Sequence, residues 1–308
     1  MTLLSMMPDQ RHWRAWVLVW FIPALWAVNF LCARLAPGVV DPHVLALGRW
    51  AIAGLLLAGW ARQEIWAERQ QIWRDRWRYL VLGSLGMLVC GAWVYWGART
   101  TTAMNIALIY ATAPVLIVWG SAIWLGESMR FKQVLGVALA LLGVVHVVVK
   151  GNWSALSQFQ WVQGDWFIMA ATLSWAAYAL LQKKWTSSLS ATARLACICA
   201  GGVVTLVPFA LWEWVQPQSP AWTWLASALV LAVALVPGIG AYWIYGWAQK
   251  TLGASRTSMT LYLGPLWGAL VSWGVLGETL GWHHAMGCLM ILPGVALVVQ
   301  PAQAAKSA

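Results

Sequence analysis

Long apolar stretches that carry almost no charge dominate this chain. Of its 308 residues, 61% are hydrophobic and only 9% are charged, whereas a soluble domain carries about 25% charged residues. So few charges cannot cover a water-facing surface, and they cluster between the apolar stretches. The pattern predicts an integral membrane protein built from helices, because the stretches lack the period-two alternation of membrane strands.

Ten of these stretches are long enough to cross about 30 Å of hydrocarbon as helices. We place them at residues 15–33, 43–61, 79–98, 102–125, 131–149, 164–182, 194–212, 224–248, 254–276 and 282–299. The first stretch is longer than the apolar core of a cleaved signal peptide, so we expect it to remain as a membrane helix. The predicted fold is an all-α integral membrane protein with ten transmembrane helices.

The second half of the sequence repeats the first. Residues 96–149 align without a gap on residues 247–300. The coinciding residues include a proline, a Leu-Gly-Glu run and two glycines: Pro114 with Pro265, 125–127 with 276–278, Gly136 with Gly287 and Gly143 with Gly294. A duplicated membrane unit is typical of secondary transporters. We therefore expect one five-helix repeat in residues 1–149, an external linker at 150–163 and a second five-helix repeat in 164–308.

The basic residues indicate how the helices are oriented. If the N-terminus is cytoplasmic, fifteen of the nineteen Lys and Arg fall in cytoplasmic segments, and only Arg34, Arg99 and Lys150 fall on the other side. The positive-inside rule therefore predicts both termini in the cytoplasm. Orientation explains the net charge of +10, so we expect no nucleic-acid partner. Because each half has an odd number of helices, the two repeats are expected to be inverted.

The chain resembles the drug/metabolite transporter superfamily and, within it, the EamA-type ten-helix exporters. Segments 105–127 and 255–278 carry the resemblance best, and it covers nearly the whole chain. The Trp-rich sequence is most similar to bacterial exporters of aromatic amino acids. The resemblance implies export of amino acids, other small metabolites or drugs through a cavity between two halves, in the inner membrane of a bacterium.

The candidate substrate site consists of uncharged polar and aromatic residues at membrane depth. Neutral hydrogen-bonding groups suit the ammonium and carboxylate of an amino acid, and aromatic walls suit a bulky side chain. We expect the site to include Trp26, Asn29, Trp93, Asn105, Tyr110, Trp175, Tyr178, Tyr245, Ser258 and Tyr262. The alternative role is to hold helices together, as polar groups in membranes often do.

Two prolines and three charges stand out within or beside the predicted helices. Pro114 and Pro265 lie at equivalent positions in the fourth and ninth helices, where each is either a hinge or gate or a static kink. Arg49 lies about six residues into the second helix, where it either binds a substrate carboxylate or snorkels to the outer surface. Glu127 and Glu278 follow the last turn of a helix, and we expect them to anchor helix ends.

The acidic residues argue against ion coupling and against enzyme classes. None of the nine lies near the middle of a predicted helix, where ion-driven carriers commonly place a carboxylate, so we expect export without a proton relay. No two acids lie within three residues of each other, which disfavours metal-dependent membrane transferases. The five cysteines suit packing between helices. We expect no cofactor and no metal site.

These observations predict a secondary transporter that exports aromatic and other bulky neutral amino acids by alternating access. The expected partners are a small-molecule substrate and the lipid bilayer, and a monomer is compatible with the sequence. Two alternatives stay open: an exporter of cationic drugs or other metabolites, and a channel or integral membrane enzyme.

Overall fold

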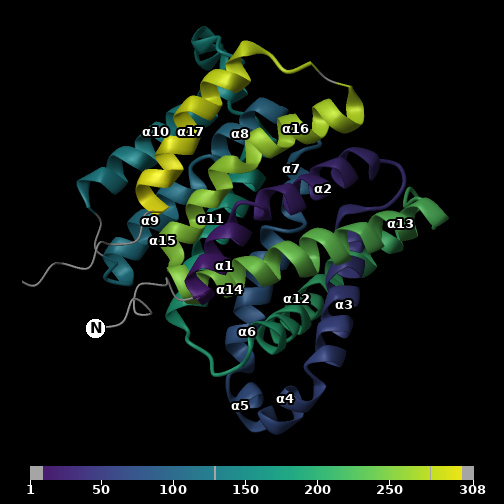
Figure 1. Cartoon of the computed structure of the whole chain (residues 1–308). Coiled ribbons are helices and arrows are strands. Elements are labelled where there is room, and N and C mark those ends of the chain that lie inside the picture. Colours follow the sequence, from purple (N-terminus) through teal and green to yellow (C-terminus); the bar gives the residue numbers. More distant parts are fainter. Residues whose placement is uncertain (1–9, 128–129, 278, 300–308) are drawn as a thin grey trace, which may run out of the picture.

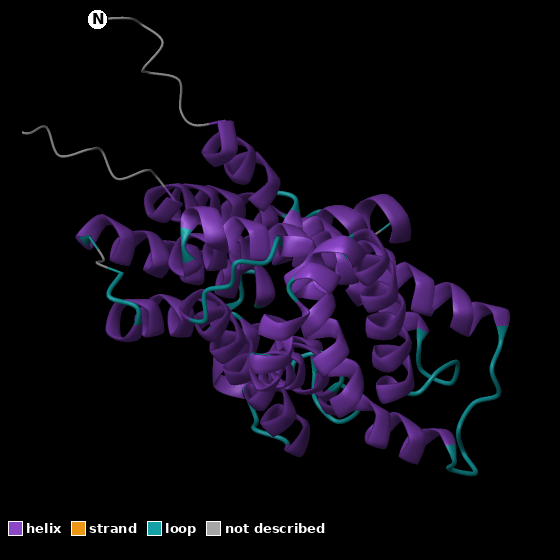
Figure 2. Ribbon diagram, turned by 90° about the horizontal axis from the view of Figure 1, so that it is seen from below, coloured by secondary structure: helices purple, strands orange, loops and turns teal. Residues whose placement is uncertain are grey.

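All ten predicted membrane segments are helical in the structure, a computed structural model that describes residues 10–127, 130–277 and 279–299. Figure 2 shows helices joined by loops, without a strand in these ranges. Within the described residues, seven segments are long and apolar enough to cross a membrane: Trp13–Ala33, Pro42–Trp60, Arg76–Gly97, Ala103–Trp124, Phe131–Val148, Ala191–Trp214 and Trp224–Leu252. The all-α prediction is confirmed. In the hydrocarbon of a bilayer, backbone N–H and C=O groups have no water to bind, and a helix satisfies them internally.

The first half of the chain consists of five predicted segments, several of which break into consecutive pieces. In order along the chain, its elements are α1 Gln10–Val19, α2 Ile22–Leu35, α3 Pro42–Trp60, α4 Arg62–Ala67, α5 Arg69–Arg74, α6 Arg76–Gly83, the π-helical turn η2 Ser84–Val89, α7 Trp93–Gly97, α8 Ala103–Tyr110, α9 Ala113–Trp124 and α10 Phe131–Val148.

The second half has breaks in corresponding segments. Its elements are the 3₁₀ turn η3 Trp153–Gln158, α11 Gln163–Lys184, α12 Ala191–Trp214, α13 Trp224–Val233, the π-helical turn η4 Ala234–Ala241, α14 Tyr242–Leu252, α15 Ala254–Ser258, the 3₁₀ turn η5 Met259–Leu263, α16 Gly264–Leu276 and α17 Trp282–Val299. The predicted segment 254–276 is therefore three short pieces rather than one continuous helix.

Among the helix pairs that join the halves, the two most extensive are visible in Figure 1: α10 beside α17, and α3 beside α12. The repeated glycines lie in the first of these interfaces. A Cβ atom added to Gly294 would lie 2.6 Å from the backbone nitrogen of Ala140, and one added to Gly136 would lie 2.6 Å from the carbonyl oxygen of Gly294. Small residues thus let the two backbones approach closely, as is common between membrane helices.

Carboxylates from one half also bind helix starts in the other half. Glu213, at the end of α12, accepts hydrogen bonds of 2.7 and 3.3 Å from backbone N–H groups in the first turn of α3. Glu127 accepts one of 3.2 Å from the backbone N–H of Ala254, at the start of α15. Glu64 accepts one of 2.6 Å from the N–H of Ser190, just before α12. Negative charge is favourable at helix starts, so these acids fasten the two halves together.

Candidate substrate site

Six aromatic side chains from both halves meet between α2, α3, α11 and α14. This aromatic cluster consists of Trp26, Trp50, Trp175, Tyr178, Tyr242 and Tyr245. The ring of Trp175 lies 5.4 Å from that of Trp26 and 5.1 Å from that of Tyr245, measured between centroids. Such edge-on and tilted contacts stabilise aromatic pairs by about 0.5–1.5 kcal/mol beyond the area they bury. The cluster is thus a packed aromatic core shared by the two halves.

Several polar atoms of the aromatic cluster are buried without a partner. Within the described ranges, no hydrogen-bond partner meets the indole N–H groups of Trp50 and Trp175 or the hydroxyl of Tyr245. A buried donor without a partner costs about 1–3 kcal/mol. Groups left in this state are suited to bind a ligand that brings its own acceptors.

Arg49, on α3, brings a positive charge to the edge of the aromatic cluster. Its side chain is 5% exposed, so the snorkelling alternative does not hold in this structure. Its Nη1 donates to Asn29 Oδ1 at 3.0 Å, and the hydroxyl of Tyr95 donates to the same oxygen at 2.9 Å. The guanidinium carbon lies 4.4 Å from the ring centroid of Trp50 and 5.6 Å from that of Tyr242. Ring faces and a neutral amide stabilise the cation without neutralising it.

Among the described residues, the guanidinium of Arg49 has an unpaired charge and a free N–H group with which it could bind a ligand. In the part of the chain that the structure describes, its Nε has no hydrogen-bond partner, and no carboxylate forms an ion pair with it. A buried charge normally requires a paired opposite charge. The missing negative charge is what the carboxylate of a small molecule could supply.

Two π-helical turns border the site, and they occupy equivalent places in the two halves, η2 starting at Ser84 and η4 at Ala234. The carbonyl of Gly86 in η2 accepts a 2.9 Å hydrogen bond from Tyr242. In η4, a Cβ atom added to Gly238 would lie 3.6 Å from the Arg49 side chain, so this turn packs directly against the arginine. Single π-helical turns within helices are frequent at functional sites.

The structure brings half of the predicted site residues together. Trp26, Trp175, Tyr178 and Tyr245 lie in the aromatic cluster, and Asn29 binds Arg49. Tyr110 lies near this group, with its hydroxyl 3.9 Å from the sulfur of Cys90, which packs against the same core. Sequence reasoning missed Trp50, Tyr95 and Tyr242, although all three are aromatic residues inside predicted helices.

Three of the other predicted site residues lie elsewhere, whereas Trp93 packs against the same core as the aromatic cluster. The amide of Asn105 donates to Asp165 at 2.8 Å, fastening α8 to the start of α11. Ser258 donates to a carbonyl of its own helix at 2.8 Å. Trp93 packs against Phe167, and Tyr262 lies in a second core with α10 and α17. These contacts correspond to the alternative role of holding helices together.

Both predicted hinge prolines lie where a membrane segment breaks. In the first half, α8 ends at Tyr110 and α9 begins at Ala113, directly before Pro114. In the second half, α16 begins at Gly264, directly before Pro265, after a 3₁₀ turn. Proline fits the first turn of a helix because its missing N–H has no partner there. The segment that follows Pro265 ends near Glu278, which lies outside the described residues.

Comparison with known proteins agrees with a duplicated membrane transporter. Residues 14–149 and residues 162–300 each match the EamA-like transporter family. An uncharacterized transporter of Bacillus subtilis (strain 168), YyaM, is 25% identical over 291 residues, which are 92% of this chain and 93% of the relative. The probable terminal-alkyne amino-acid exporter of Streptantibioticus cattleyicolor is 27% identical over 286 residues, 92% of this chain and 83% of the relative.

A solved crystal structure has the same fold. It superposes with a TM-score of 0.73 at 19% identity and covers 91% of this chain and 94% of its own. The duplicated family match accounts for the breaks and glycines that recur in both halves. The chain belongs to the EamA-like transporter family, within the drug/metabolite transporter superfamily, and is a multi-pass membrane transporter rather than an enzyme.

Proposed function

We propose that this protein exports aromatic and other bulky neutral amino acids across the cytoplasmic membrane of a bacterium. The observation that carries the proposal is Arg49, a buried guanidinium without a carboxylate partner in the described chain, beside six aromatic rings. A guanidinium binds a carboxylate through two parallel hydrogen bonds. The aromatic rings match a planar or bulky side chain, and one relative is named as an amino-acid exporter.

The charge of the site favours a zwitterion over a cation. The carboxylate of a neutral amino acid would balance Arg49, while its ammonium could meet aromatic ring faces and the oxygen of Asn29. A cationic drug would bring a second positive charge close to Arg49, and like charges at close range cost several kcal/mol. This charge balance supports the amino-acid substrate over the alternative of cationic drugs.

The proposed mechanism is alternating access between two inverted halves, residues 1–149 and 164–308, joined by the external linker 150–163. Arg49 and Asn29 come from the first half, whereas Trp175 and Tyr245 come from the second. Relative movement of the halves would therefore open and close one shared site. Pro114 and Pro265 are the proposed hinges, and both termini are proposed to lie in the cytoplasm.

The positions of the acids support export without a proton relay. Glu64, Glu127 and Glu213 are bound at helix starts, and Asp165 is bound by Asn105 near the start of α11. None of these four carboxylates is hydrogen-bonded to a residue of the aromatic cluster. We therefore expect the substrate gradient, rather than a bound proton, to drive transport.

The proposal is tested with purified protein in liposomes and a panel of labelled amino acids. We expect saturable uptake of L-tryptophan, L-phenylalanine and L-leucine, little uptake of L-lysine or L-glutamate, and no dependence on a pH gradient. Transport of cationic drugs without any amino acid would favour the alternative substrate class. Transport of neither class would contradict the proposed function.

A further inference from the structure

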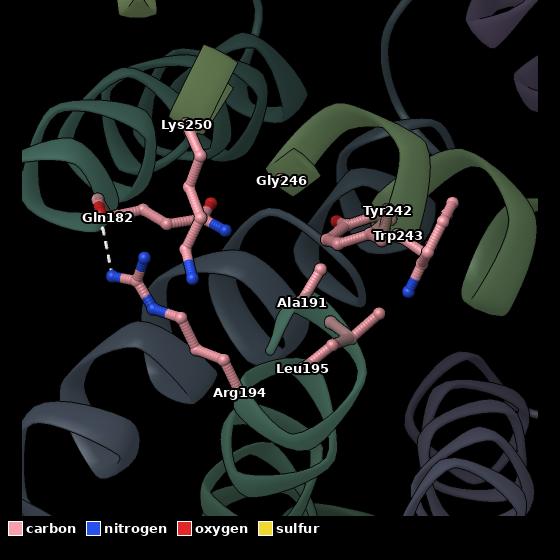
Figure 3. A pocket seen from close by; sticks show the side chains of 8 residues that line it. All are labelled: Gln182, Ala191, Arg194, Leu195, Tyr242, Trp243, Gly246 and Lys250. Carbon is pink, nitrogen blue, oxygen red and sulfur yellow. Dashed lines mark hydrogen bonds between the residues drawn. The ribbon is translucent and has the colours of Figure 1, made fainter. Parts of the chain in front are cut away.

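A crevice with a volume of about 300 Å³ opens where α11, α12 and α14 meet, near the loop at 185–190. Its wider part and its inner extension share four residues, Gln182, Arg194, Gly246 and Lys250. Figure 3 shows the tips of Arg194, Lys250 and Gln182 converging on one side, with Tyr242 and Trp243 on the other. The crevice therefore has a cationic end and an aromatic end.

Three cations line this crevice without a carboxylate among its lining residues: Lys183, Arg194 and Lys250. Arg194 is 5% exposed, and its Nη2 donates to the carbonyl oxygens of Gln182 and Trp185, each at 2.6 Å. Its Nε has no partner in the described chain. A buried arginine bound only by neutral carbonyls keeps its full positive charge, and its free N–H can serve a ligand.

Lys250 adds a second charge with unused donors. Its Nζ donates to the carbonyl of Leu189 at 2.6 Å, which occupies one of three N–H groups. The acid that approaches from α4 is Glu64, whose two oxygens both accept from Ser190, at 2.6 Å each. Both oxygens of Glu64 are therefore already hydrogen-bonded at the start of α12, and the crevice keeps a net attraction for anions.

The inner end of the crevice reaches the candidate substrate site. Tyr242 lines the crevice and belongs to the aromatic cluster, and its ring centroid lies 5.6 Å from the guanidinium carbon of Arg49. One tyrosine thus stands between the cationic crevice and the buried arginine. The positive-inside orientation places the ends of α11 and α14, with Lys183, Lys184 and Lys250, on the cytoplasmic side.

We propose that this crevice is the cytoplasmic entry site for substrate, where Arg194 and Lys250 bind the substrate carboxylate before it passes Tyr242 to reach Arg49. The inference rests on the proposed export of neutral amino acids, because it assigns the same carboxylate to two successive cations. Clustered positive charge in a cleft raises the local concentration of anionic groups. The entry site would therefore select for a carboxylate before the aromatic cluster selects for a side chain.

Protection of lysines from acetylation tests binding in the crevice without measuring transport. Full-length protein in phosphatidylcholine nanodiscs is treated with an amine-acetylating reagent, and each lysine is followed by mass spectrometry. The probe is 3-indolepropionate, which has a carboxylate but no ammonium, and the uncharged 3-indolepropionamide is its matched control. We expect 3-indolepropionate at twice its dissociation constant to slow acetylation of Lys250 about threefold. 3-Indolepropionamide should not protect Lys250, and neither compound should protect the exposed Lys132 at the start of α10.

Substitutions at Arg194 separate anion binding from a purely structural role. Arg194→Gln should raise the concentration of 3-indolepropionate needed to protect Lys250 by about tenfold, the loss expected for one charge-assisted hydrogen bond. Arg194→Lys should retain most of the protection. A melting temperature in detergent close to that of the wild type confirms that each variant is folded. Equal protection in all three proteins would overturn the proposal.

Two further outcomes separate this inference from its alternatives. If phosphatidylglycerol in the nanodisc protects Lys250 without added solute, a lipid phosphate occupies the crevice and the entry-site proposal is wrong. If L-tryptophan is transported in liposomes but 3-indolepropionate gives no protection, the entry site fails while the proposed function stands. Protection without transport of any amino acid would leave an anion site but contradict both the proposed function and the entry role.

Discussion

Replacing Arg49 by glutamine removes the charge on which the proposed substrate site depends. A hydrogen bond to a charged group contributes about 1.5–3 kcal/mol, and a carboxylate could form two with this guanidinium. Glutamine could replace one of them with a neutral bond of about 1 kcal/mol, so the net loss is about 2–5 kcal/mol. The dissociation constant of L-tryptophan should therefore rise about 30- to 4,000-fold.

The same substitution should leave the protein without substrate at least as stable as the wild type. Arg49 is buried without a carboxylate partner in the described chain, and an unpaired buried charge is unfavourable. Asn29 would keep its 2.9 Å hydrogen bond from Tyr95 after the change. We expect the melting temperature of the Arg49→Gln protein in detergent to equal or exceed that of the wild type.

The assay compares binding of L-tryptophan with binding of L-tryptophanamide, which lacks the carboxylate. The wild type should prefer L-tryptophan strongly, and Arg49→Gln should abolish this preference. Arg99→Gln is the matched control, because that arginine is 49% exposed and lies 3.9 Å from Asp41. Binding of L-tryptophan by Arg49→Gln within threefold of the wild type would refute the carboxylate role. A large fall in melting temperature would show that Arg49 is structural instead.

Three further predictions test the fold and the proposed hinges. Gly294→Ala should lower the unfolding free energy by about 1–3 kcal/mol, because its Cβ would meet the backbone of α10 at 2.6 Å. In the control variant Gly268→Ala, the new Cβ has no atom within 4 Å, so the unfolding free energy should change by less than about 0.5 kcal/mol. Thermal unfolding in detergent measures both changes. Glu127→Gln should cost about 1–2 kcal/mol by weakening the bond to α15, and an unchanged melting temperature would contradict the capping role. Replacing Pro114 and Pro265 together by alanine should slow transport in liposomes without weakening substrate binding, and a normal rate would exclude a hinge.

The positions of the membrane helices could be predicted because the hydrocarbon of a bilayer requires predominantly apolar side chains along the whole length of a span. Apolar length and the placement of charges therefore predicted ten segments, all of which are helical in the described residues. The breaks inside them were harder to predict. Pro114 and Pro265 signalled two of the breaks, but the π-helical turns η2 and η4 have no sequence pattern of their own beyond glycines and Pro237. Such turns depend on which carbonyls find partners in neighbouring helices.

The site was only partly predictable, because membrane depth does not reveal which way a side chain faces. Asn105 and Asn29 look alike in sequence, yet Asn105 binds Asp165 and Asn29 binds Arg49. Tyr242 follows directly after a π-helical turn, which shifts the register of the following helix, so its place in the cluster could not be read from regular periodicity. In each case, the position of the side chain depends on a partner from a distant segment of the chain.

Substrate counterflow tests the central claim, a carrier for neutral amino acids with one site shared by two halves, most directly. Liposomes that contain the protein are loaded with unlabelled L-tryptophan, and entry of labelled L-tryptophan is followed from outside. We expect loading to accelerate entry, a proton ionophore to have no effect, and Arg49→Gln to abolish the acceleration. Entry that is unchanged by loading would indicate a channel, and entry that is unchanged by Arg49→Gln would contradict the shared site.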